Sequence, residues 1–210
     1  MSSTLIPPRS LDTSLCILPR TFYARDTRLV ARELLAKVLV HHLPGGTRLS
    51  GRIVEVEAYR PDDSASHSFR GPTARNAPMF GAPGLAYVYL IYGLHNCVNV
   101  STEAVGISAA VLIRALEPID GIQIMQQRRG IQTVSKLCRG PGNVCKALGI
   151  DRSLIGLDLT RRGSVLAIAD DCLRPDQIGT SERVGVRGDA AAREAPWRFF
   201  IAGNGCVSDK

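Results

Sequence analysis

The sequence predicts a single domain in which α-helices and β-strands are mixed. Apolar residues recur at helical spacing over residues 27–37, and β-branched or aromatic residues alternate with others over 47–59 and 87–100. No repeat, low-complexity block or linker divides the 210 residues, and a chain of this length buries a substantial core. We therefore expect one domain over residues 20–210, preceded by an extended lead-in over residues 1–19.

The first elements in chain order are a helix and a β-hairpin. The Arg25-Asp26-Thr27 step offers an N-cap for a helix over residues 27–37. Residues 38–42 are β-like in composition, and residues 43–46 contain a proline and two glycines, which is typical of a turn. A second strand over 47–59 follows, so the two strands are predicted to form a hairpin.

Residues 51–59, Gly-Arg-Ile-Val-Glu-Val-Glu-Ala-Tyr, form the most informative stretch of this hairpin. Because side chains alternate along a strand, we expect a solvated face or a functional one around the two carboxylates. A carboxylate beside a tyrosine at the mouth of a cleft can act as a general base, and Asp62, Asp63 and His67 follow closely. The predicted faces are Ile53, Glu55, Glu57 and Tyr59 on one side, and Val54, Val56 and Ala58 on the other.

Residues 60–86 lack a regular pattern, contain four prolines and form a long loop. The apolar pair Met79-Phe80 argues that this loop packs on the core. Arg70 and Arg75 within it can bind a phosphate together with neighbouring backbone amides; the alternative is that they only make the surface soluble.

A second hairpin is predicted over residues 87–100, with Tyr92 and Leu94 near its tip. Tyr87 and Tyr89 share one strand face. Aromatic residues on strands are usually packing partners, but an exposed aromatic residue at a hairpin tip can also insert between stacked bases. The residues alone leave both roles open.

The apolar run over 108–116 predicts a buried strand that contains Arg114. Because arginine is rarely buried without a partner, Arg114 either forms a structural ion pair or reaches into the same cleft as Glu57. A turn around Arg139 and Gly140 leads into a helix whose N-terminus can hold a phosphate. The further predicted elements are helices over 120–129 and 143–148, a strand over 183–186 and an apolar end over 196–201.

Composition indicates an intracellular protein with an anionic partner, although a basic proteome would give the same charge. The net charge is +7 and nearly all of the positive charge is arginine. No apolar run is long enough for a membrane span, and no secretion signal is present, so we expect a cytoplasmic or nucleoid protein in a bacterium, or a nuclear one in a eukaryote. The spacing of six cysteines and four histidines fits no metal motif; we predict reduced, mostly buried thiols, no structural metal and no cofactor.

Taken together, these stretches resemble the alkyladenine (3-methyladenine) DNA glycosylase family, the monofunctional enzymes that remove alkylated and deaminated purines in base-excision repair. The resemblance extends from about Arg20 to Val207. Asn96 stands where an aromatic residue is common in relatives. The stretches that carry the resemblance are 51–59 with His67, Arg75-Asn76, Met79-Phe80, Pro83-Gly84, 87–93 with Asn99, 113–118, 137–141, 183–186 and 196–200.

The resemblance implies how the chemistry is divided among the residues. Glu57 matches the general base that activates the attacking water, and Arg114 matches the arginine that helps to hold this water. Tyr92 matches the wedge that fills the space vacated in the duplex, with Leu94 beside it. No lysine stands near these motifs to form a Schiff base, so we expect no strand-cleaving lyase activity.

The base pocket follows from the same resemblance. Tyr59, His67 and Tyr89 match the residues around the flipped purine, and Asn99 matches the one that excludes the amino group of normal guanine. The expected substrates are 3-methyladenine and, within a breadth that differs among members, 7-methylguanine, hypoxanthine and ethenoadenine. Contacts with the DNA backbone are predicted for Arg70, Arg75, Arg139 and Gly140.

The fold implied is α+β: a curved, mostly antiparallel β-sheet with surrounding helices and a protruding β-hairpin that wedges into DNA. The expected partner is double-stranded DNA that contains damaged purines. We expect the protein to bind this DNA as a monomer and not to associate with a membrane. Two alternatives remain. A non-catalytic binder of distorted duplex would need Tyr92 but not Glu57, and a metal-dependent nuclease would use Glu55, Glu57, Asp62 and Asp63.

Overall fold

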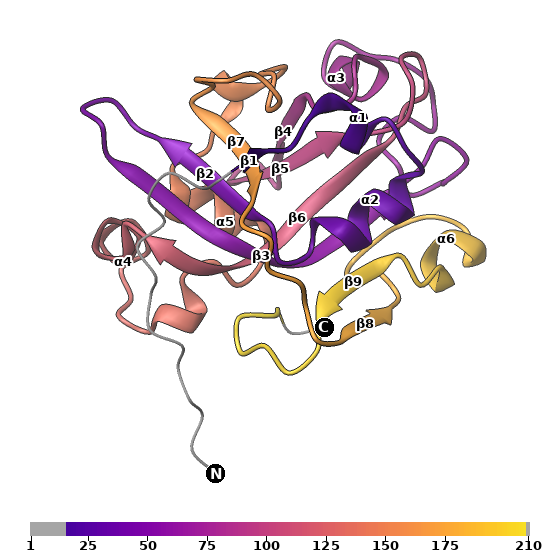
Figure 1. Cartoon of the computed structure of the whole chain (residues 1–210). Helices are drawn as coiled ribbons and strands as arrows, with labels where there is room; N and C mark the ends of the chain where they lie inside the picture. Colours follow the sequence, from indigo (N-terminus) through magenta and orange to yellow (C-terminus); the bar gives the residue numbers. More distant parts are fainter. Residues whose placement is uncertain (1–15, 209–210) are drawn as a thin grey trace.

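The longest strand of the sheet, β3 (Arg48–Tyr59), organises the fold. In the computed structural model, which describes residues 16–208, β3 pairs along one edge with β6 (Ala110–Asp120). On its other edge, β3 pairs first with β2 (Val38–His42) and then with β9 (Arg198–Ile201). β3 therefore joins two parts of the sheet (Figure 1).

The other strands extend a curled antiparallel sheet around β3. The order is β1-β7-β2-β3-β6-β5-β4, and β8 pairs with β9. All pairings among residues 16–208 are antiparallel, which confirms the predicted α+β class and sheet type. The remaining bounds are β1 (Cys16–Ile17), β4 (Ala86–Ile91), β5 (His95–Ser101), β7 (Leu166–Asp170) and β8 (Ile178–Ser181).

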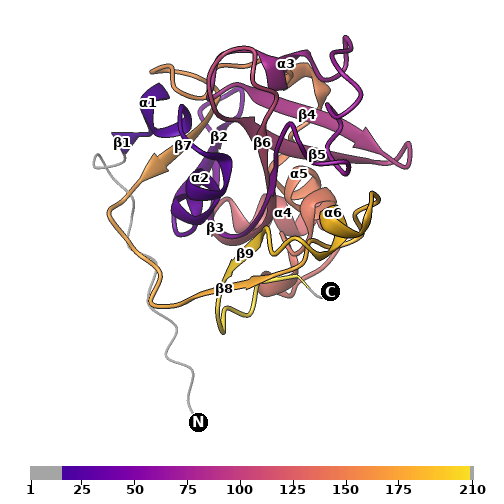
Figure 2. The same ribbon diagram turned by 90° about the vertical axis from the view of Figure 1, so that its right-hand side faces the viewer.

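Helices cover the sheet from opposite sides. α2 (Thr27–Leu34) packs on β3 and β6, whereas α5 (Pro141–Leu148) packs on β5 and β6 from the other side (Figures 1 and 2). Both contribute to one hydrophobic core, through Val30 of α2 and Leu148 of α5, for example. The other helices are α1 (Arg20–Tyr23), α3 (Ala77–Phe80), α4 (Ile122–Arg129) and α6 (Ala190–Glu194), with 3-10 turns at Val134–Lys136 and Arg152–Leu154.

A β-bulge interrupts β3 near the point where its partner changes. The register of β3 against β6 shifts on both sides of Glu55. Ile53 and Val56 consequently share the main core, whereas Val54 packs beside Cys206 in a small separate cluster. The predicted alternation, with Ile53 on the face of the glutamates and Val54 beside Val56, is wrong because the extra residue resets the period of two.

The predicted helix N-cap is confirmed, but the helix ends early. The Asp26 carboxylate accepts hydrogen bonds from the backbone N–H groups of Arg28 (2.9 Å) and Leu29 (3.4 Å). α2 then stops at Leu34 instead of residue 37, because Leu35 is extended and Ala36 has a φ of 69°.

Near the end of the lead-in predicted for residues 1–19, residues 16 and 17 are extended and pair with β7; residues 1–15 lie outside the described residues. One other predicted segment differs. Residues 183–186 form a loop between β8 and α6 instead of a strand. In this loop the backbone N–H of Val184 donates to the Glu57 carboxylate and not to a neighbouring strand.

Both predicted hairpins are confirmed, and the second one protrudes from the domain (Figure 2). At its tip, Tyr92 and Gly93 have φ angles of 53° and 70°, and the Leu94 N–H donates to the Ile91 carbonyl at 3.1 Å. This is a type I′ turn, whose twist matches that of the flanking strands. It leaves Tyr92 79% and Leu94 78% exposed.

We predict that one buried ion pair makes the fold sensitive to acid. Lys37 lies 2.8 Å from Asp170 at the end of β7. Burial raises the pKa of Asp170, but hydrogen bonds from Lys37, Arg174 and the Cys172 backbone lower it to about 2 from 3.8. The stability that depends on ionised Asp170 is thus complete above about pH 4 and is lost as the pH falls toward 2.

Urea unfolding at a series of pH values checks this expectation. Between pH 4 and pH 2, the free energy of unfolding should decrease more steeply for the wild type than for Asp170→Asn. Parallel curves for the two proteins in this interval would contradict the assignment.

Candidate active site

Glu57 lies near the end of β3 without solvent exposure, held by three hydrogen-bond or ion-pair donors. Its Oε1 atom accepts from the Val184 backbone N–H at 2.7 Å and lies 3.1 Å from Nη1 of Arg114. Its Oε2 atom accepts from the Tyr59 hydroxyl at 2.8 Å. Because every donor comes from a different element, the fold fixes the direction of this carboxylate. A solvated strand face is excluded.

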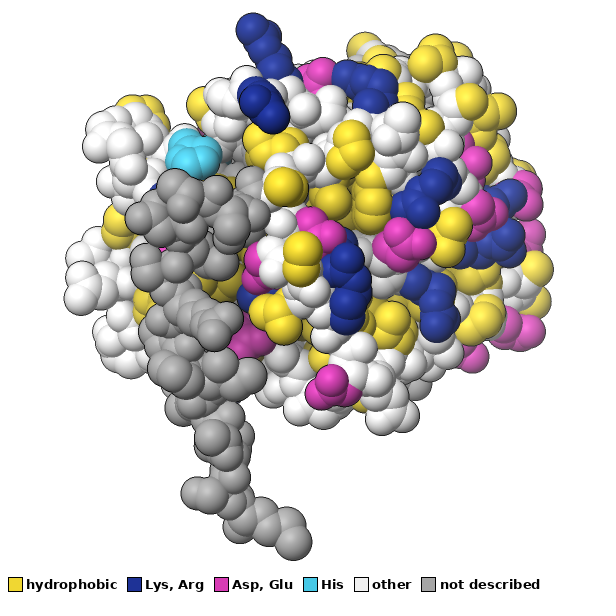
Figure 3. All heavy atoms as spheres, in the orientation of Figure 1, with side chains coloured by type: hydrophobic (Ala, Val, Ile, Leu, Met, Phe, Trp, Pro, Cys, Tyr) yellow, Lys and Arg dark blue, Asp and Glu magenta, His cyan; other side chains and the backbone are white. Residues whose placement is uncertain are grey.

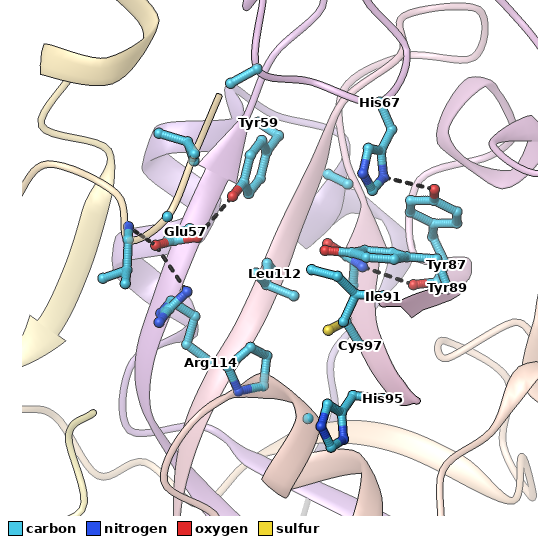
Figure 4. A pocket seen from close by; sticks show the side chains of 18 of the residues that line it. Glu57, Tyr59, His67, Tyr87, Tyr89, Ile91, His95, Cys97, Leu112 and Arg114 are labelled. Atoms are coloured by element: carbon cyan, nitrogen blue, oxygen red, sulfur yellow. Dashed lines mark hydrogen bonds and ion pairs between the residues drawn. The ribbon is translucent and has the colours of Figure 1, made fainter. Parts of the chain in front are cut away.

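The carboxylate faces a cavity of about 550 Å³. Glu57, Tyr59 and Arg114 form one wall, and an aromatic group of His67, Tyr87 and Tyr89 faces them across the opening (Figure 4). The structure thus brings together every residue predicted for catalysis and for the base pocket, with Asn99 and Leu112 also lining the cavity. The volume is in the range of small-molecule sites.

The aromatic wall is held together by ring contacts. The His67 and Tyr89 rings meet edge to face, with centroids 4.5 Å apart, and the Tyr87 and Tyr89 rings lie 5.4 Å apart. Nδ1 of His67 is hydrogen-bonded to the Tyr87 hydroxyl at 3.0 Å. Nδ2 of Asn99 donates to the backbone carbonyl of Tyr87 at 3.0 Å. Tyr87 thus orients two predicted pocket residues. The sequence placed Tyr87 on the same strand face as Tyr89 but did not predict this role.

The environment keeps this wall uncharged near neutral pH. Partial burial, and then the charge of Arg75, lower the pKa of His67 from 6.5. Burial raises the pKa of the Tyr59 and Tyr89 hydroxyls far above 10, and it raises that of Cys97 to about 11. His67, Tyr59, Tyr89 and Cys97 of the cavity lining are therefore uncharged at neutral pH.

Arg114 bridges two carboxylates. Its Nε donates to Glu55 at 2.9 Å, while Nη1 lies 3.1 Å from Glu57. Both predicted roles thus hold for Arg114, since it forms a buried ion pair and also reaches the cleft beside Glu57. Burial lowers the pKa of Arg114, but the two glutamates raise it above its ordinary value, so this guanidinium is charged.

Arg183 is a site residue that the sequence reasoning missed. It forms a fully buried ion pair with Asp63 and donates to the carbonyls of Ala58 (3.0 Å) and Ala192 (2.8 Å). Its guanidinium also lies over the ring of Tyr59, with 4.6 Å between the Cζ atom and the ring centroid. These contacts fix residues 183–187, four of which line the cavity, and so place the N–H of the following residue on Glu57.

The predicted wedge residues lie at the rim of the cavity. Tyr92 lines it, and Leu94 is exposed beside it. Four residues were predicted to contact the DNA backbone. Of these, Arg70 is exposed on its loop and Gly140 precedes α5. Arg75 lies over the Tyr89 ring at 5.4 Å, and Arg139 donates from Nε to the Val207 carbonyl at 2.7 Å. Contacts of these residues with DNA stay a prediction.

The face over which α2 lies offers no continuous basic surface, because acidic and basic side chains are interspersed on it (Figure 3). Arg25 and Arg28, for example, pair with Glu33 and Asp26. Among residues 16–208, no three His, Cys, Asp or Glu side chains are grouped to hold a metal ion, and the cysteines are free, with four of the six buried. No helix in this part of the chain is long and apolar enough to cross a bilayer.

Comparisons with known proteins agree with the family resemblance that the sequence showed. A family model described as "Methylpurine-DNA glycosylase (MPG)" matches residues 21–205. A protein of Mesorhizobium japonicum is 51% identical over 183 residues, which cover 87% of this chain and 86% of that protein. Proteins of Carboxydothermus hydrogenoformans and Methanoculleus marisnigri are 45% and 47% identical over 195 residues, covering 92% and 91% of this chain and 100% and 98% of theirs. All three carry the name "Putative 3-methyladenine DNA glycosylase".

We expect the buried Arg183–Asp63 pair to be required for folding as well as for the site. Asp63→Ala leaves a buried guanidinium without its anion, which costs about 3–5 kcal/mol in the free energy of unfolding. Chemical denaturation measures this loss. Asp62→Ala is the matched control, because its carboxylate is exposed and pairs with the neighbouring Arg60. A loss no larger than the control's would show that the pair is dispensable.

Proposed function

The chain belongs to the methylpurine-DNA glycosylase family, and from this premise we propose how it removes damaged purines from DNA. It is a DNA-3-methyladenine glycosylase of base-excision repair. The proposal is that a damaged purine is flipped out of the duplex into the cavity beside Glu57, where water activated by this carboxylate hydrolyses the N-glycosidic bond. The proposed substrates are either 3-methyladenine alone or a range that also includes 7-methylguanine, hypoxanthine and ethenoadenine.

One observation carries this proposal: a buried, oriented carboxylate faces an aromatic wall across a cavity that opens beside an exposed tyrosine. A base cannot be attacked inside its stack, so the nucleotide must rotate out at a cost of a few kcal/mol. Tyr92, at the tip of the protruding hairpin, can occupy the vacated space and partly offset that cost. Leu94 widens the wedge on the same turn.

The extruded purine would lie between the two walls of the cavity. Tyr59, His67 and Tyr89 present aromatic surfaces to the base, and their uncharged state allows a cationic alkylated purine to bind without repulsion. Asn99 is fixed by its bond to Tyr87 and would crowd the amino group of normal guanine.

Hydrolysis requires only the water, Glu57 and Arg114. Glu57 takes a proton from the water while the water oxygen bonds to C1′ of the sugar. The electron pair of the C1′–N bond leaves with the purine. The negative carboxylate also stabilises the positive charge that develops on the sugar, and Arg114 holds the water through its guanidinium. The cavity lining contains no lysine for Schiff-base chemistry, which supports a monofunctional enzyme. We further propose that the enzyme acts as a monomer.

The two alternatives have weaker support. A non-catalytic binder of distorted DNA would not need a buried carboxylate with three donors at the cavity wall. A nuclease that shares Mg²⁺ among Glu55, Glu57, Asp62 and Asp63 would need these oxygens to converge. Instead Glu55 and Asp63 are engaged by different arginines, Arg114 and Arg183, and Asp62 is exposed.

Replacement of the carboxylate tests the mechanism. In single-turnover reactions with EDTA, on a duplex carrying one hypoxanthine or 3-methyladenine, Glu57→Gln should release base at least about 10²-fold more slowly than wild type, because the amide cannot take the proton. The wild type should leave an abasic strand uncut. Equal rates for the two proteins would favour the non-catalytic binder, and loss of wild-type activity in EDTA would favour the nuclease.

Truncation of the wedge tests the flipping step. Tyr92→Ala should slow base release by about 10- to 100-fold, because a few kcal/mol of offset for the unstacked base are lost. Tyr92→Phe should retain most of the rate, since the ring persists. The unrelated exposed residue Leu173 provides a control as Leu173→Ala. If Tyr92→Ala matches this control in single-turnover rate, the hairpin is not the wedge.

A further inference from the structure

Glu55 is a buried carboxylate that the proposed mechanism does not use. It has no solvent exposure and lies at the bulge of β3, two residues before Glu57. Its Oε1 atom accepts from Nε of Arg114 at 2.9 Å and from Nε of Arg198 at 2.7 Å. Glu55 therefore holds one side of the guanidinium whose other side meets Glu57.

The remaining contacts of Glu55 come from Ser208, far along the chain. The Ser208 backbone N–H donates to Oε2 at 2.7 Å, and the hydroxyl donates to Oε1 at 2.8 Å. The same hydroxyl accepts from Nη2 of Arg114 at 3.4 Å, and the Ser208 carbonyl accepts from Nη2 of Arg198 at 3.0 Å. Ser208 thus touches Glu55 and both of its arginines.

The two residues before Ser208 are both anchored to the domain. Cys206 is buried against Val54 and Ala115, and the Val207 carbonyl accepts from Nε of Arg139 at 2.7 Å. Ser208 is therefore delivered to Glu55 by packing as well as by its own hydrogen bonds.

Charge balance explains why this arrangement matters. Glu55, Glu57, Arg114 and Arg198 are all buried, so two negative and two positive side chains share one poorly solvated region. Burial raises the pKa of Glu55, but Arg114, the two Ser208 donors and Arg198 together lower it below 4.5. With Glu55 ionised and fully hydrogen-bonded, Arg114 stays in the one orientation that serves both glutamates.

We infer that Ser208 is a positioning residue of the active site: it fixes Glu55, and Glu55 fixes Arg114 so that its guanidinium faces Glu57. This inference rests on the proposed function only for its kinetic consequence. Ser208 is not among the residues that line the cavity, so it acts through Glu55 and Arg114.

Ser208→Ala tests the inference in the full-length protein. At saturating enzyme, the single-turnover rate of base release should fall about tenfold, because a hydrogen bond to a buried charge is lost. The dissociation constant for the lesion-containing duplex should change less than about twofold. Ser208→Thr keeps both donors and should restore the rate. Ser164→Ala is the matched control, since the Ser164 hydroxyl is buried without a hydrogen-bond partner.

A second readout does not depend on activity. In ¹⁵N NMR spectra, the Nε–H group of Arg114 should exchange with water more rapidly in Ser208→Ala than in wild type or Ser164→Ala, because its acceptor Glu55 becomes less restrained. An unchanged rate together with unchanged exchange overturns the inference. So does a parallel loss of rate, DNA affinity and thermal stability, which marks a purely structural residue. If wild type releases no base but the exchange still increases, the proposed function fails while the positioning of Arg114 by Ser208 stands.

Discussion

Two carboxylates without solvent contact, two residues apart on one strand, impose the condition that the rest of this structure satisfies. A buried charge is tolerated only with partners of opposite charge and with its lone pairs hydrogen-bonded. Glu55 and Glu57 obtain these partners from β6, from β9, from the loop after β8 and from the segment that contains Ser208. The antiparallel sheet brings these distant parts of the chain to one place, so its topology provides the groups that compensate the buried charges of the site.

The bulge in β3 lies where the neighbour of this strand changes. β2 pairs with β3 as far as Arg52, and β9 pairs with it from Glu55, which brings Arg198 to Glu55. A bulge bends a strand and increases its local twist, which suits such a change of partner. Hydrophobic residues on both sides of the change lie in the core, while Glu57 faces the cavity and Glu55 faces Arg198 and Ser208. Local irregularity thus serves an electrostatic purpose.

The sequence predicted what depends on local rules. The Asp26 cap, the two hairpins and the buried strand with Arg114 follow from side-chain chemistry and short-range periodicity. The curled sheet, the cavity and its residues were predicted from family resemblance, not from spacing. What was missed arises from long-range contacts: the bulge has no signature in the alternation of 51–59, and Arg183 sits in a short β-like stretch that becomes a loop because its side chain pairs with Asp63.

The distribution of charge around the cavity suits its proposed chemistry. One wall concentrates formal charge on a single oriented carboxylate and its guanidinium, while the opposite wall of His67, Tyr87 and Tyr89 is kept neutral by burial. The neutral wall cannot protonate a leaving purine efficiently, because its groups hold their protons too tightly or have none to give at neutral pH. Such a site favours bases whose glycosidic bond is already weakened by alkylation. Under the proposed mechanism, selection of alkylated over normal purines would then follow in part from the lack of a general acid on this wall, and not only from the shape of the pocket.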